Sequence, residues 1–595
     1  MNVLLAAINA KYIHSNLAVY SLKAYAEKEW DSEAGQKEIQ EDTKPIIAIA
    51  EYTINQTVDQ ILMDLYRRKP DMLCFSCYLW NIEYVEHLLR EIPKILPHTE
   101  IWLGGPEVSW NAEEVLARFP QVRGVMRGEG EETFYQLLRA RNEDLRKIDG
   151  ITLRDHDAII ATNERATMDL SEIPFVYEDM DPFEHKIIYY ESSRGCPFSC
   201  SYCLSSIDKC LRFRDPEQVK RELQFFIDRK VPQVKFVDRT FNCRHDHAMA
   251  IWKYLAEHDN GTTNFHFEVA ADLLNEEEIR LIRSMRPGLI QLEIGVQSTN
   301  EQTIREIRRT MKFSEVARIV NEVRAGGNIH QHLDLIAGLP YEDMESFHRS
   351  FNDVYALRPQ QLQLGFLKVL KGSYMEEKAE DYGLVFQERP PFEVLSTKWI
   401  SYKDVIRLKG IEEMVEVYYN SGQFVHTMER LEPVFGDAFA MYDALRAYYE
   451  AHGLDQVNHS RIGRYEILWA FLTEHLENHL SESKNTFEEL ITGLTDDWRE
   501  QFRESLTYDL YLRENVKNRP AFAGEETVEK RIAAAFYERE ESEHQYLQNG
   551  YEGRDRRQMR KMTHLEKIGG KLLLFDYQNR DALCNQARVV AVEEV

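Results

Sequence analysis

Three cysteines stand close together in residues 193–203, which read SRGCPFSCSYC and place Cys196, Cys200 and Cys203 at x3 and x2 spacing. Thiolates are soft ligands that favour iron–sulfur clusters, zinc or Cu(I), so this spacing predicts a shared metal site. A structural zinc ion or a fully ligated [4Fe–4S] cluster normally takes four protein ligands, and no fourth cysteine follows at a similar spacing. An iron–sulfur cluster on this loop would therefore keep one iron open to a small molecule. A zinc loop or three buried thiols is the alternative.

The loop resembles that of the radical S-adenosylmethionine (SAM) enzymes, which is written C-x3-C-x-aromatic-C. Its positions are matched by Cys196, Cys200, Tyr202 and Cys203. The resemblance implies a [4Fe–4S] cluster on the three cysteines, SAM on the fourth iron, and Tyr202 beside the cofactors. It also implies reductive cleavage of SAM to a 5′-deoxyadenosyl radical. A low-potential donor of the flavodoxin or ferredoxin type would supply the electron.

The residues around this loop alternate between strand-like and helical patterns. Strand-like runs lie at 187–191, 234–238, 265–270, 289–295 and 331–336, and helical stretches lie at 216–229, 276–285 and 315–325. This order predicts a series of βα units within about 185–375. The resemblance implies that the units close into a partial (β/α)6 barrel. The chemistry of such barrels lies at the carboxyl ends of the strands.

Polar residues gather at these predicted strand ends. The candidates for contacts with SAM are Asp238, Glu268, Glu293 and Gln297. A carboxylate there can accept hydrogen bonds from an amino group or from ribose hydroxyls once water is excluded. In family terms, Asp238 stands at the motif that binds the methionyl amino group, whereas Glu293 and Gln297 correspond loosely to the ribose motif. Pairing of each carboxylate with a nearby arginine is the alternative, and for Glu268 the two interpretations are equally open.

Residues 1 to about 175 show the same alternation. Continuous apolar runs lie at 3–8, 46–50, 72–76 and 101–103, and helical stretches such as 57–68 and 83–96 separate them. Runs of this kind predict strands that are buried on both faces. The pattern predicts a parallel, doubly wound, Rossmann-like sheet, in which ligands bind outside the carboxyl ends of the strands.

The loops at those strand ends contain glycines, aromatic residues and helix starts. The candidate cofactor contacts are Ser76, Tyr78, Trp80, Gly104, Gly105, Gly128 and Glu129. Glycine lets the backbone approach a ligand closely, and helix N-termini can meet phosphate. The segment resembles the cobalamin-binding domain that precedes the radical SAM core in one branch of the superfamily, and the GGPEVS loop at 104–109 is its most specific match. The resemblance implies cobalamin with its base detached, Tyr78 or Trp80 over its lower face, and no cobalt ligand assigned to His14.

Beyond about residue 375 this alternation stops. Apolar residues at helical spacing occur at 403–420, 428–452, 464–480 and 528–550, and one strand-like run occurs at 572–577. The pattern predicts a mostly α-helical region over 376–595. It resembles an accessory domain of unassigned function in cobalamin-binding radical SAM proteins, and its place in the chain would let it cap the barrel. The expected fold class is therefore α/β in domains 1–175 and 185–375, followed by a helical domain.

The composition limits the kinds of binding partner and the cellular compartment that we expect. The 595 residues include 73 Lys and Arg against 100 Asp and Glu, a formal net charge of −27. Such a surface repels phosphate backbones, so nucleic acid is not an expected partner. No apolar run approaches the roughly 20 residues that span a bilayer, and the first residues lack the basic region of a signal peptide. Eight cysteines are too few for a disulfide framework, and an iron–sulfur loop needs a reducing compartment. We expect a cytoplasmic protein without a membrane partner.

Together these features predict a cobalamin-dependent radical SAM enzyme that acts on a small-molecule or peptide substrate. The resemblance implies hydrogen abstraction from an unactivated carbon and methyl transfer from methylcobalamin, which is the activity of a methyltransferase. Two alternatives stay open. The same cofactors could serve a rearrangement, cyclisation or oxidation without methyl transfer, or the chain could be a non-catalytic sensor that binds cobalamin or a metal.

Overall fold

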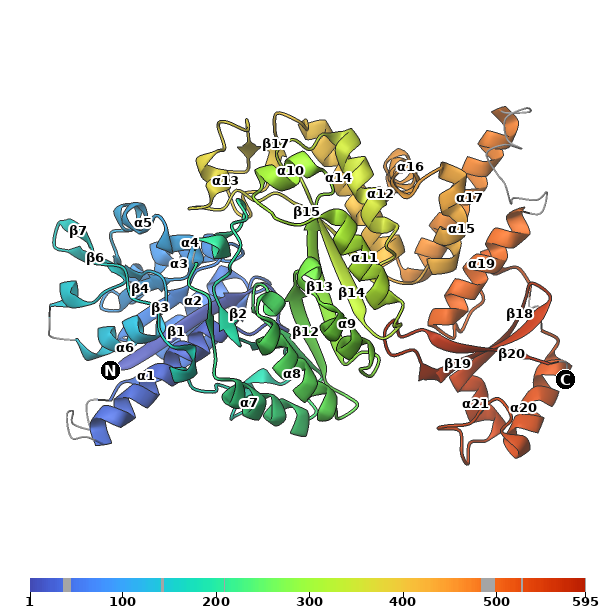
Figure 1. Ribbon diagram of the computed structural model, residues 1–595, viewed down its shortest axis with the longest axis horizontal. Coiled ribbons are helices and arrows are strands. Elements are labelled where there is room, and N and C mark those ends of the chain that lie inside the picture. Colours follow the sequence, from blue (N-terminus) through green and yellow to red (C-terminus); the bar gives the residue numbers. More distant parts are fainter. Residues whose placement is uncertain (36–43, 141–143, 208, 483–497, 526–527, 594–595) are drawn as a thin grey trace.

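The computed structural model describes residues 1–35, 44–140, 144–207, 209–482, 498–525 and 528–593. The chain forms three successive parts (Figure 1). A sheet flanked by helices forms the N-terminal end (blue to cyan), a second sheet with its own helices follows (green to yellow), and helices with a small third sheet complete the chain (orange and red). In the described part, no helix is both long enough and apolar enough to cross a lipid bilayer.

The N-terminal sheet has seven strands in the order β2-β1-β3-β4-β5-β6-β7. The strands are β1 (Asn2–Asn9), β2 (Ile46–Thr53), β3 (Met72–Ser76), β4 (Glu100–Gly104), β5 (Val122–Met126), β6 (Ile151–Asp155) and β7 (Ala158–Ala161). The first five are parallel, whereas β6 and β7 add antiparallel at one edge. Every residue of β1 after the first is buried, as its continuous apolar run predicts.

Helices cover both faces of this sheet. The helices α1 (Leu17–Gly35) and α6 (Glu131–Arg139) share one core with alternate residues of β1. The helices α2 (Val58–Arg68), α3 (Ile82–Ile95) and α5 (Ala112–Arg118) share the core on the opposite face. The expected doubly wound, Rossmann-like arrangement is thereby confirmed. The carboxyl ends of its parallel strands form one edge at which a ligand could bind.

The second sheet has six parallel strands in the order β15-β14-β13-β12-β11-β8. The strands are β8 (Ile188–Tyr190), β11 (Gln233–Phe236), β12 (Asn264–Val269), β13 (Ile290–Gln297), β14 (His330–Ala337) and β15 (Gln361–Phe366). The connecting helices are α7 (Pro216–Asp228), α8 (His245–Glu257), α9 (Glu276–Arg283), α10 (Glu301–Glu306), α11 (Phe313–Arg324) and α12 (Met344–Tyr355). Because β8 and β15 are the two ends of the strand order, the sheet is a partial barrel, as expected. The strand β15 was not predicted, since polar Gln361 and Gln363 interrupt its apolar pattern.

The C-terminal third is mostly helical, as expected. Its helices are α14 (Tyr402–Val415), α15 (Val425–Phe435), α16 (Ala438–Ala451), α17 (Arg461–Glu482), α19 (Trp498–Arg513), α20 (Lys530–Glu543) and α21 (Arg556–Met562). Its strands β18 (Thr563–Ile568), β19 (Lys571–Arg580) and β20 (Ala587–Val592) form an antiparallel sheet. The sequence predicted only the middle strand of the three.

The helical spacing over residues 428–452 covers parts of two successive helices. Gly436, with a φ of 83°, ends the first of them, α15. Asp437 then starts α16, because its side chain accepts a hydrogen bond from the backbone N–H of Ala440 at 2.8 Å. The helices α15 and α16 therefore follow each other within this stretch.

The segment that leads into the C-terminal third contacts the cysteine loop. The N–H of Met375 donates to the carbonyl oxygen of Ser201 at 2.9 Å. The helix α16 packs instead against α12, and Ala582, between β19 and β20, contacts Gly288 at the amino end of β13. The expected cap of the C-terminal domain over the barrel stays a prediction.

Candidate functional site

The cysteine loop is the tip of a β-hairpin. The strand β9 (Ser193–Arg194) pairs antiparallel with β10 (Arg212–Phe213), so that Arg194 lies opposite Arg212. Gly195 begins the loop with a φ of 91°, and a Cβ at this position would lie 2.6 Å from the carbonyl oxygen of Cys210. A side chain is excluded there by both backbone conformation and space. The hairpin follows β8 directly, so the loop stands at the carboxyl end of the first barrel strand.

The three loop cysteines are free thiols, of which Cys196 and Cys200 are buried and Cys203 is half-buried. Burial raises the pKa of Cys200, the Arg309 guanidinium lowers it, and the neighbouring thiols of Cys203 and Cys196 raise it. Cys200 Sγ lies 3.7 Å from Arg309 Nη1, and Cys196 Sγ lies 3.7 Å from Thr240 Oγ1. Three soft donors within eight residues of one loop suit an iron–sulfur cluster with one open corner. The residues present therefore fit the group that the loop motif implies.

A cation that the sequence analysis missed lies against this loop. Arg309, which follows α10, donates through Nη2 to the carbonyl oxygen of Gly295 at 2.6 Å and through Nη1 to Tyr202 Oη at 3.2 Å. The same Nη1 lies 3.7 Å from Cys200 Sγ. Tyr202 thus holds a positive charge beside a loop cysteine. No local pattern marks Arg309, because it lies 109 residues from Cys200 in the sequence.

Asp238 follows β11 and is fully buried under the hairpin. Its carboxylate accepts hydrogen bonds from Ser192 N at 3.0 Å, Ser192 Oγ at 2.7 Å and Ser193 Oγ at 2.6 Å. Burial raises the pKa of Asp238 to about 6, although these hydrogen bonds oppose the rise. The carboxylate therefore supports the strand that leads into the cysteine loop. Its predicted contact with the methionyl amino group stays a prediction.

Two predicted carboxylates lie side by side inside the barrel, since Glu268 of β12 is in register with Glu293 of β13. Burial alone would raise the pKa of Glu293, but His266 at 2.9 Å and Lys235 at 3.0 Å lower it to about 2. Burial raises the pKa of Glu268 to about 7, against the opposing charge of Arg239. Near neutral pH one carboxyl is thus ionised and the other is partly protonated. Neighbouring carboxyls with such different pKa values are typical of functional sites.

The same interior face holds a group with metal-ligand spacing. Ligand atoms of Glu293, His332 and Asp334 all lie within 4.8 Å of one another, and His332 Nε2 is 3.0 Å from Asp334 Oδ1. However, the Lys235 ammonium already lies 3.0 Å from Glu293 Oε2. A resident cation next to this carboxylate opposes a metal ion by like-charge repulsion. The group is therefore best described as a charge-compensated polar lining.

Gln297 ends β13 with a φ of 70°, and its side chain folds back over the strand. A Cβ on Gly295 would lie 2.3 Å from Gln297 Nε2. Gln297 Oε1 is buried and has no hydrogen-bond partner among the described residues. An orphaned acceptor at the carboxyl edge of the barrel fits a ligand that offers hydroxyl or amino donors. This observation is consistent with the predicted SAM site.

The aromatic pair predicted to face cobalamin follows β3. The rings of Tyr78 and Trp80 stack with centroids 4.5 Å apart and planes 9° apart. Trp80 Nε1 donates to the carbonyl oxygen of Ile8 at 3.0 Å, and Ser76 Oγ accepts from Asn16 Nδ2 at 3.1 Å. These contacts fix the loop after β3 to the ends of β1 and α1. The side chain of Trp80 stays 44% exposed, so the pair is open on the Trp80 side.

The predicted cofactor glycines differ in their surroundings. A Cβ on Gly105, whose φ is 107°, would lie 2.5 Å from the carbonyl oxygen of Cys77, so this glycine is required by contact between two loops. A Cβ on Gly104 would make only ordinary contact with Met126. Gly128 has a φ of 70°, and no described atom lies within 4 Å of its Cβ position. Of the three glycines, Gly128 therefore has the open space that a ligand needs.

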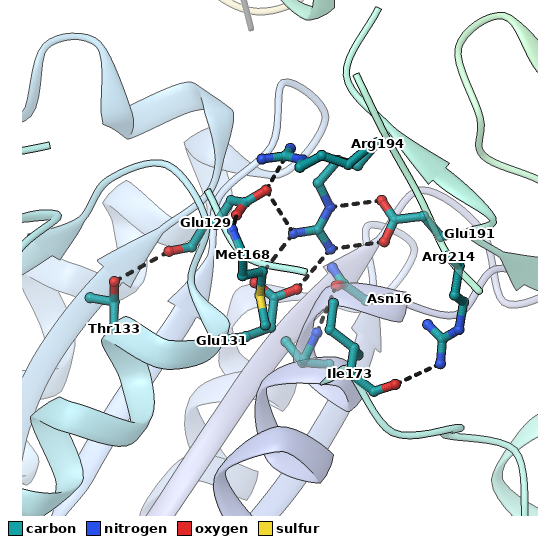
Figure 2. A network of polar contacts seen from close by, with 11 residues as sticks. Asn16, Glu129, Glu131, Thr133, Met168, Ile173, Glu191, Arg194 and Arg214 are labelled. Atoms are coloured by element: carbon teal, nitrogen blue, oxygen red, sulfur yellow. Dashed lines mark hydrogen bonds and ion pairs between the residues drawn. The ribbon is translucent and has the colours of Figure 1, made fainter. Parts of the chain in front are cut away.

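Glu129, a further predicted cofactor residue, takes part in ion pairs with the hairpin (Figure 2). Its Oε1 lies 2.8 Å from Arg212 Nη2 and 3.3 Å from Arg194 Nη1. Arg194 also pairs with Glu131 and Glu191, each at 2.8 Å. The loop after β5 is thus joined electrostatically to both strands of the cysteine hairpin, a link that sequence patterns did not indicate.

Other polar contacts join the same two parts of the chain. They are Glu107–Lys371 at 2.7 Å, Glu51–Lys186 at 2.5 Å and His14–Tyr189 at 2.6 Å. The N-terminal members all lie at or after the carboxyl ends of strands in the first sheet. The contact of His14 is made by its Nδ1 atom with Tyr189 Oη. The carboxyl edge of the first sheet therefore lies against the part of the barrel that carries the hairpin.

Comparison with protein families gives three separate matches along the chain. Residues 3–138 match the B12 binding domain, residues 190–354 match the radical SAM superfamily, and residues 380–590 match a protein family of unknown function, DUF4080. These matches cover the first sheet, the partial barrel with the cysteine hairpin, and most of the C-terminal third.

Two curated relatives are methyltransferases. The cobalamin-dependent radical SAM methyltransferase TokK of Streptomyces tokunonensis is 26% identical over 399 residues, which are 62% of this chain and 56% of the relative. The 2-(S-pantetheinyl)-carbapenam-3-carboxylate methyltransferase of Streptantibioticus cattleyicolor is 27% identical over 303 residues, 47% of this chain and 44% of that protein. The chain therefore spans about half the length of these relatives.

A solved structure has a similar fold over most of the chain. The cobalamin-dependent SAM radical enzyme OxsB, solved with aqua-cobalamin and SAM bound, aligns with a TM-score of 0.55 at 15% identity, and the alignment covers 86% of this chain and 83% of OxsB. The likeness supports the arrangement of the sheets. Along the chain, a region that matches the B12 binding domain thus precedes a region that matches the radical SAM superfamily, and a region that matches a family of unknown function follows.

Proposed function

We propose that this chain is a cobalamin-dependent radical SAM methyltransferase. In the proposal, Cys196, Cys200 and Cys203 hold a [4Fe–4S] cluster, SAM binds the open iron, and cobalamin binds at the carboxyl edge of the first sheet. When bound, these cofactors supply a 5′-deoxyadenosyl radical and a transferable methyl group, which suit methylation of an unactivated carbon. The chain's own residues place the cofactors, exclude water and hold charge.

One observation carries this proposal. The three free thiols stand on a hairpin at the carboxyl end of β8, and ion pairs join that hairpin to the loop after β5 in the first sheet. Ligands of both folds bind at carboxyl strand ends. A ligand on either edge would therefore lie beside a ligand on the other, as transfer of a group between them requires.

The predicted contacts with SAM become part of the proposal in a refined form. Gln297 offers a buried, unpartnered acceptor, and Glu268 offers a carboxyl whose raised pKa lets it donate or accept. Glu293 pairs with Lys235 at 3.0 Å, so we assign it to the charge balance of the lining. We assign Asp238 to support of the hairpin and Tyr202 to orientation of the guanidinium beside the loop.

For cobalamin we propose the loops after β3, β4 and β5. The candidates are Ser76, Tyr78, Trp80, Gly104, Gly105, Gly128 and Glu129. The open space at Gly128 favours close approach of a ligand to the backbone there. Gly105 and Glu129 act through the shape of these loops, because each is engaged by protein atoms.

The proposal includes partners and organisation. The substrate is a small molecule or peptide, and a flavodoxin- or ferredoxin-type protein supplies low-potential electrons in the cytoplasm. We propose domain limits at 1–175, 185–375 and 376–595, in which the last domain shapes the site only through the segment up to residue 400.

Anaerobic reconstitution tests this function. The chain would be loaded with iron, sulfide, cobalamin and SAM, reduced, and incubated with metabolite extracts that are screened for a mass gain of one methyl group. Methylation requires S-adenosylhomocysteine together with 5′-deoxyadenosine. Formation of 5′-deoxyadenosine alone would favour rearrangement, cyclisation or oxidation, and tightly held zinc without sulfide would favour a sensor. The variant with alanine at all three loop cysteines is the negative control.

A further inference from the structure

One acidic residue forms ion pairs with both strands of the hairpin that carries the cysteines. Arg194 precedes the loop, Arg212 follows it, and the two are paired residues of β9 and β10. Both guanidinium groups lie within 3.3 Å of Glu129 Oε1. A single carboxylate therefore bridges the two ends of the loop that residues 195–211 form.

The contact is shielded from solvent. The side chains of Arg212 and Glu129 are 14% and 15% exposed, and that of Arg194 is 21% exposed. Burial raises the pKa of Glu131, but the neighbouring Arg194 guanidinium and backbone hydrogen bonds together hold it below its usual value. Salt screens a shielded network weakly, and removal of one partner leaves a buried charge without compensation.

Glu129 is itself held firmly from its own side (Figure 2). Its Oε2 accepts a hydrogen bond from the N–H of Met168 at 3.0 Å, and its carbonyl oxygen accepts from Thr133 Oγ1 at 3.2 Å. The carboxylate is therefore a fixed point of the first domain. A carboxylate that is held in place can restrict the movement of a hairpin, whereas a solvated carboxylate would move with the hairpin.

The residues of this contact are close in sequence to both proposed cofactor sites. Glu129 is adjacent to Gly128, the glycine that faces open space at the edge of the first sheet. Arg194 stands two residues before Cys196. The ion pairs of Glu129 therefore connect the cysteine hairpin directly to the loop at the proposed cobalamin edge.

We propose that Glu129 is a positioning residue that locks the cysteine hairpin to the first domain. It orders residues 195–207 and 209–211 before any cofactor is bound and sets the separation between the cysteine loop and the loop after β5. The ordering of the hairpin does not depend on the proposed function. The effect on the distance between cobalamin and the cluster does depend on the proposed function.

The first test uses the full chain without cofactors. Amide hydrogen exchange of residues 195–211 would be compared between the wild type, Glu129→Gln and Arg212→Gln. We expect each variant to exchange about tenfold faster in this segment, since each removes an ion pair between Glu129 and the hairpin. The control Glu132→Gln removes a neighbouring charge that pairs with Arg165 at 3.2 Å and not with the hairpin, and it should exchange as the wild type does.

The double variant decides whether the two residues act as one unit. If they do, Glu129→Gln with Arg212→Gln should exchange no faster than either single variant, because coupled residues are not additive. Glu129→Asp keeps the charge and should restore part of the protection. Wild-type exchange in Glu129→Gln, or effects that multiply in the double variant, would overturn the proposal. If Glu129→Gln fails to fold, Arg212→Gln on the barrel side gives the same decision.

A second measurement addresses the separation. In chain loaded with cluster and Co(II) cobalamin, the electron paramagnetic resonance spectrum reports the magnetic interaction between the two centres. We expect this interaction to weaken or broaden in Glu129→Gln and to stay unchanged in Glu132→Gln. An unchanged interaction in Glu129→Gln would overturn the part that concerns separation. A chain that binds no cobalamin would refute the proposed function and leave the exchange result standing.

Discussion

Replacing Arg309 by glutamine should lower the reduction potential of the cluster that we propose on the cysteine loop. Arg309 places a positive charge 3.7 Å from Cys200 Sγ, measured from Nη1. Reduction adds one negative charge to a cluster, and charges or hydrogen bonds at its sulfur atoms set its potential. Glutamine can still form hydrogen bonds but carries no charge. The oxidised cluster therefore becomes more stable relative to the reduced cluster.

The distance sets the size of this effect. Two unit charges 3.7 Å apart interact by about 4.5 kcal/mol at an effective dielectric constant of about 20. We take about a quarter to a half of the added charge to reside near this sulfur atom, which leaves about 1–2 kcal/mol. For a one-electron couple, in which about 59 mV is a tenfold change, the expected shift is about 50–100 mV.

An anaerobic redox titration followed by electron paramagnetic resonance measures the shift. The control is Arg305→Gln, which removes the same charge from the exposed side of α10 without contact to the loop. We expect the control to shift the potential by less than about 20 mV, because an exposed charge is screened by water and salt. Equal potentials in the two variants, at equal iron and sulfide contents, would refute the reasoning.

Other substitutions test further features of the structure. Asp238 has a folded-state pKa of about 6, above its unfolded value of about 3.9. Between these pH values the native state binds more protons than the unfolded state, so the free energy of unfolding falls as the pH rises through them. Relative to Asp238→Asn, the wild type should therefore lose about 2–3 kcal/mol of unfolding free energy between pH 4 and pH 6.5, measured by urea unfolding of the chain without cofactors; parallel pH profiles would contradict this. Gly105→Ala should lower the melting temperature far more than Gly128→Ala, since its Cβ would meet the carbonyl oxygen of Cys77 at 2.5 Å whereas Gly128 faces open space. Equal shifts in the two variants would show that the contact is not limiting. Cys203→Ala should abolish stable iron and sulfide incorporation, and retention of the wild-type iron content would disprove its role as a ligand.

Much of the fold could be predicted because it rests on local patterns. The buried strand β1 reads as an unbroken apolar run, and α2 begins at the capping box of Thr57, as the pattern over 57–68 indicates. The cysteine loop is equally local, since its spacing lies within eight residues. The helical spacing over 428–452 did not mark the boundary at Gly436, whose positive φ divides this region between two helices.

The candidate site could be predicted only in part. Asp238, Glu268 and Gln297 were found because they stand at the ends of strands, a position that the alternation of elements predicts. Their partners were not found, because Ser192 lies 46 residues from Asp238 in the sequence, and Arg309 lies 107 residues from Tyr202. Contacts over such separations leave no periodic trace in a single sequence.

Composition, apolar periodicity and cysteine spacing together specify two α/β units and a soft-ligand loop, since these properties depend on neighbours within one turn or one strand. The assignment of each charged residue to a ligand, a partner or the lining depends instead on which distant segments meet. Glu129 reads as a polar loop residue until folding places it between Arg194 and Arg212. The physical reason is that an ion pair is decided by distance and burial in three dimensions, and chain order fixes neither.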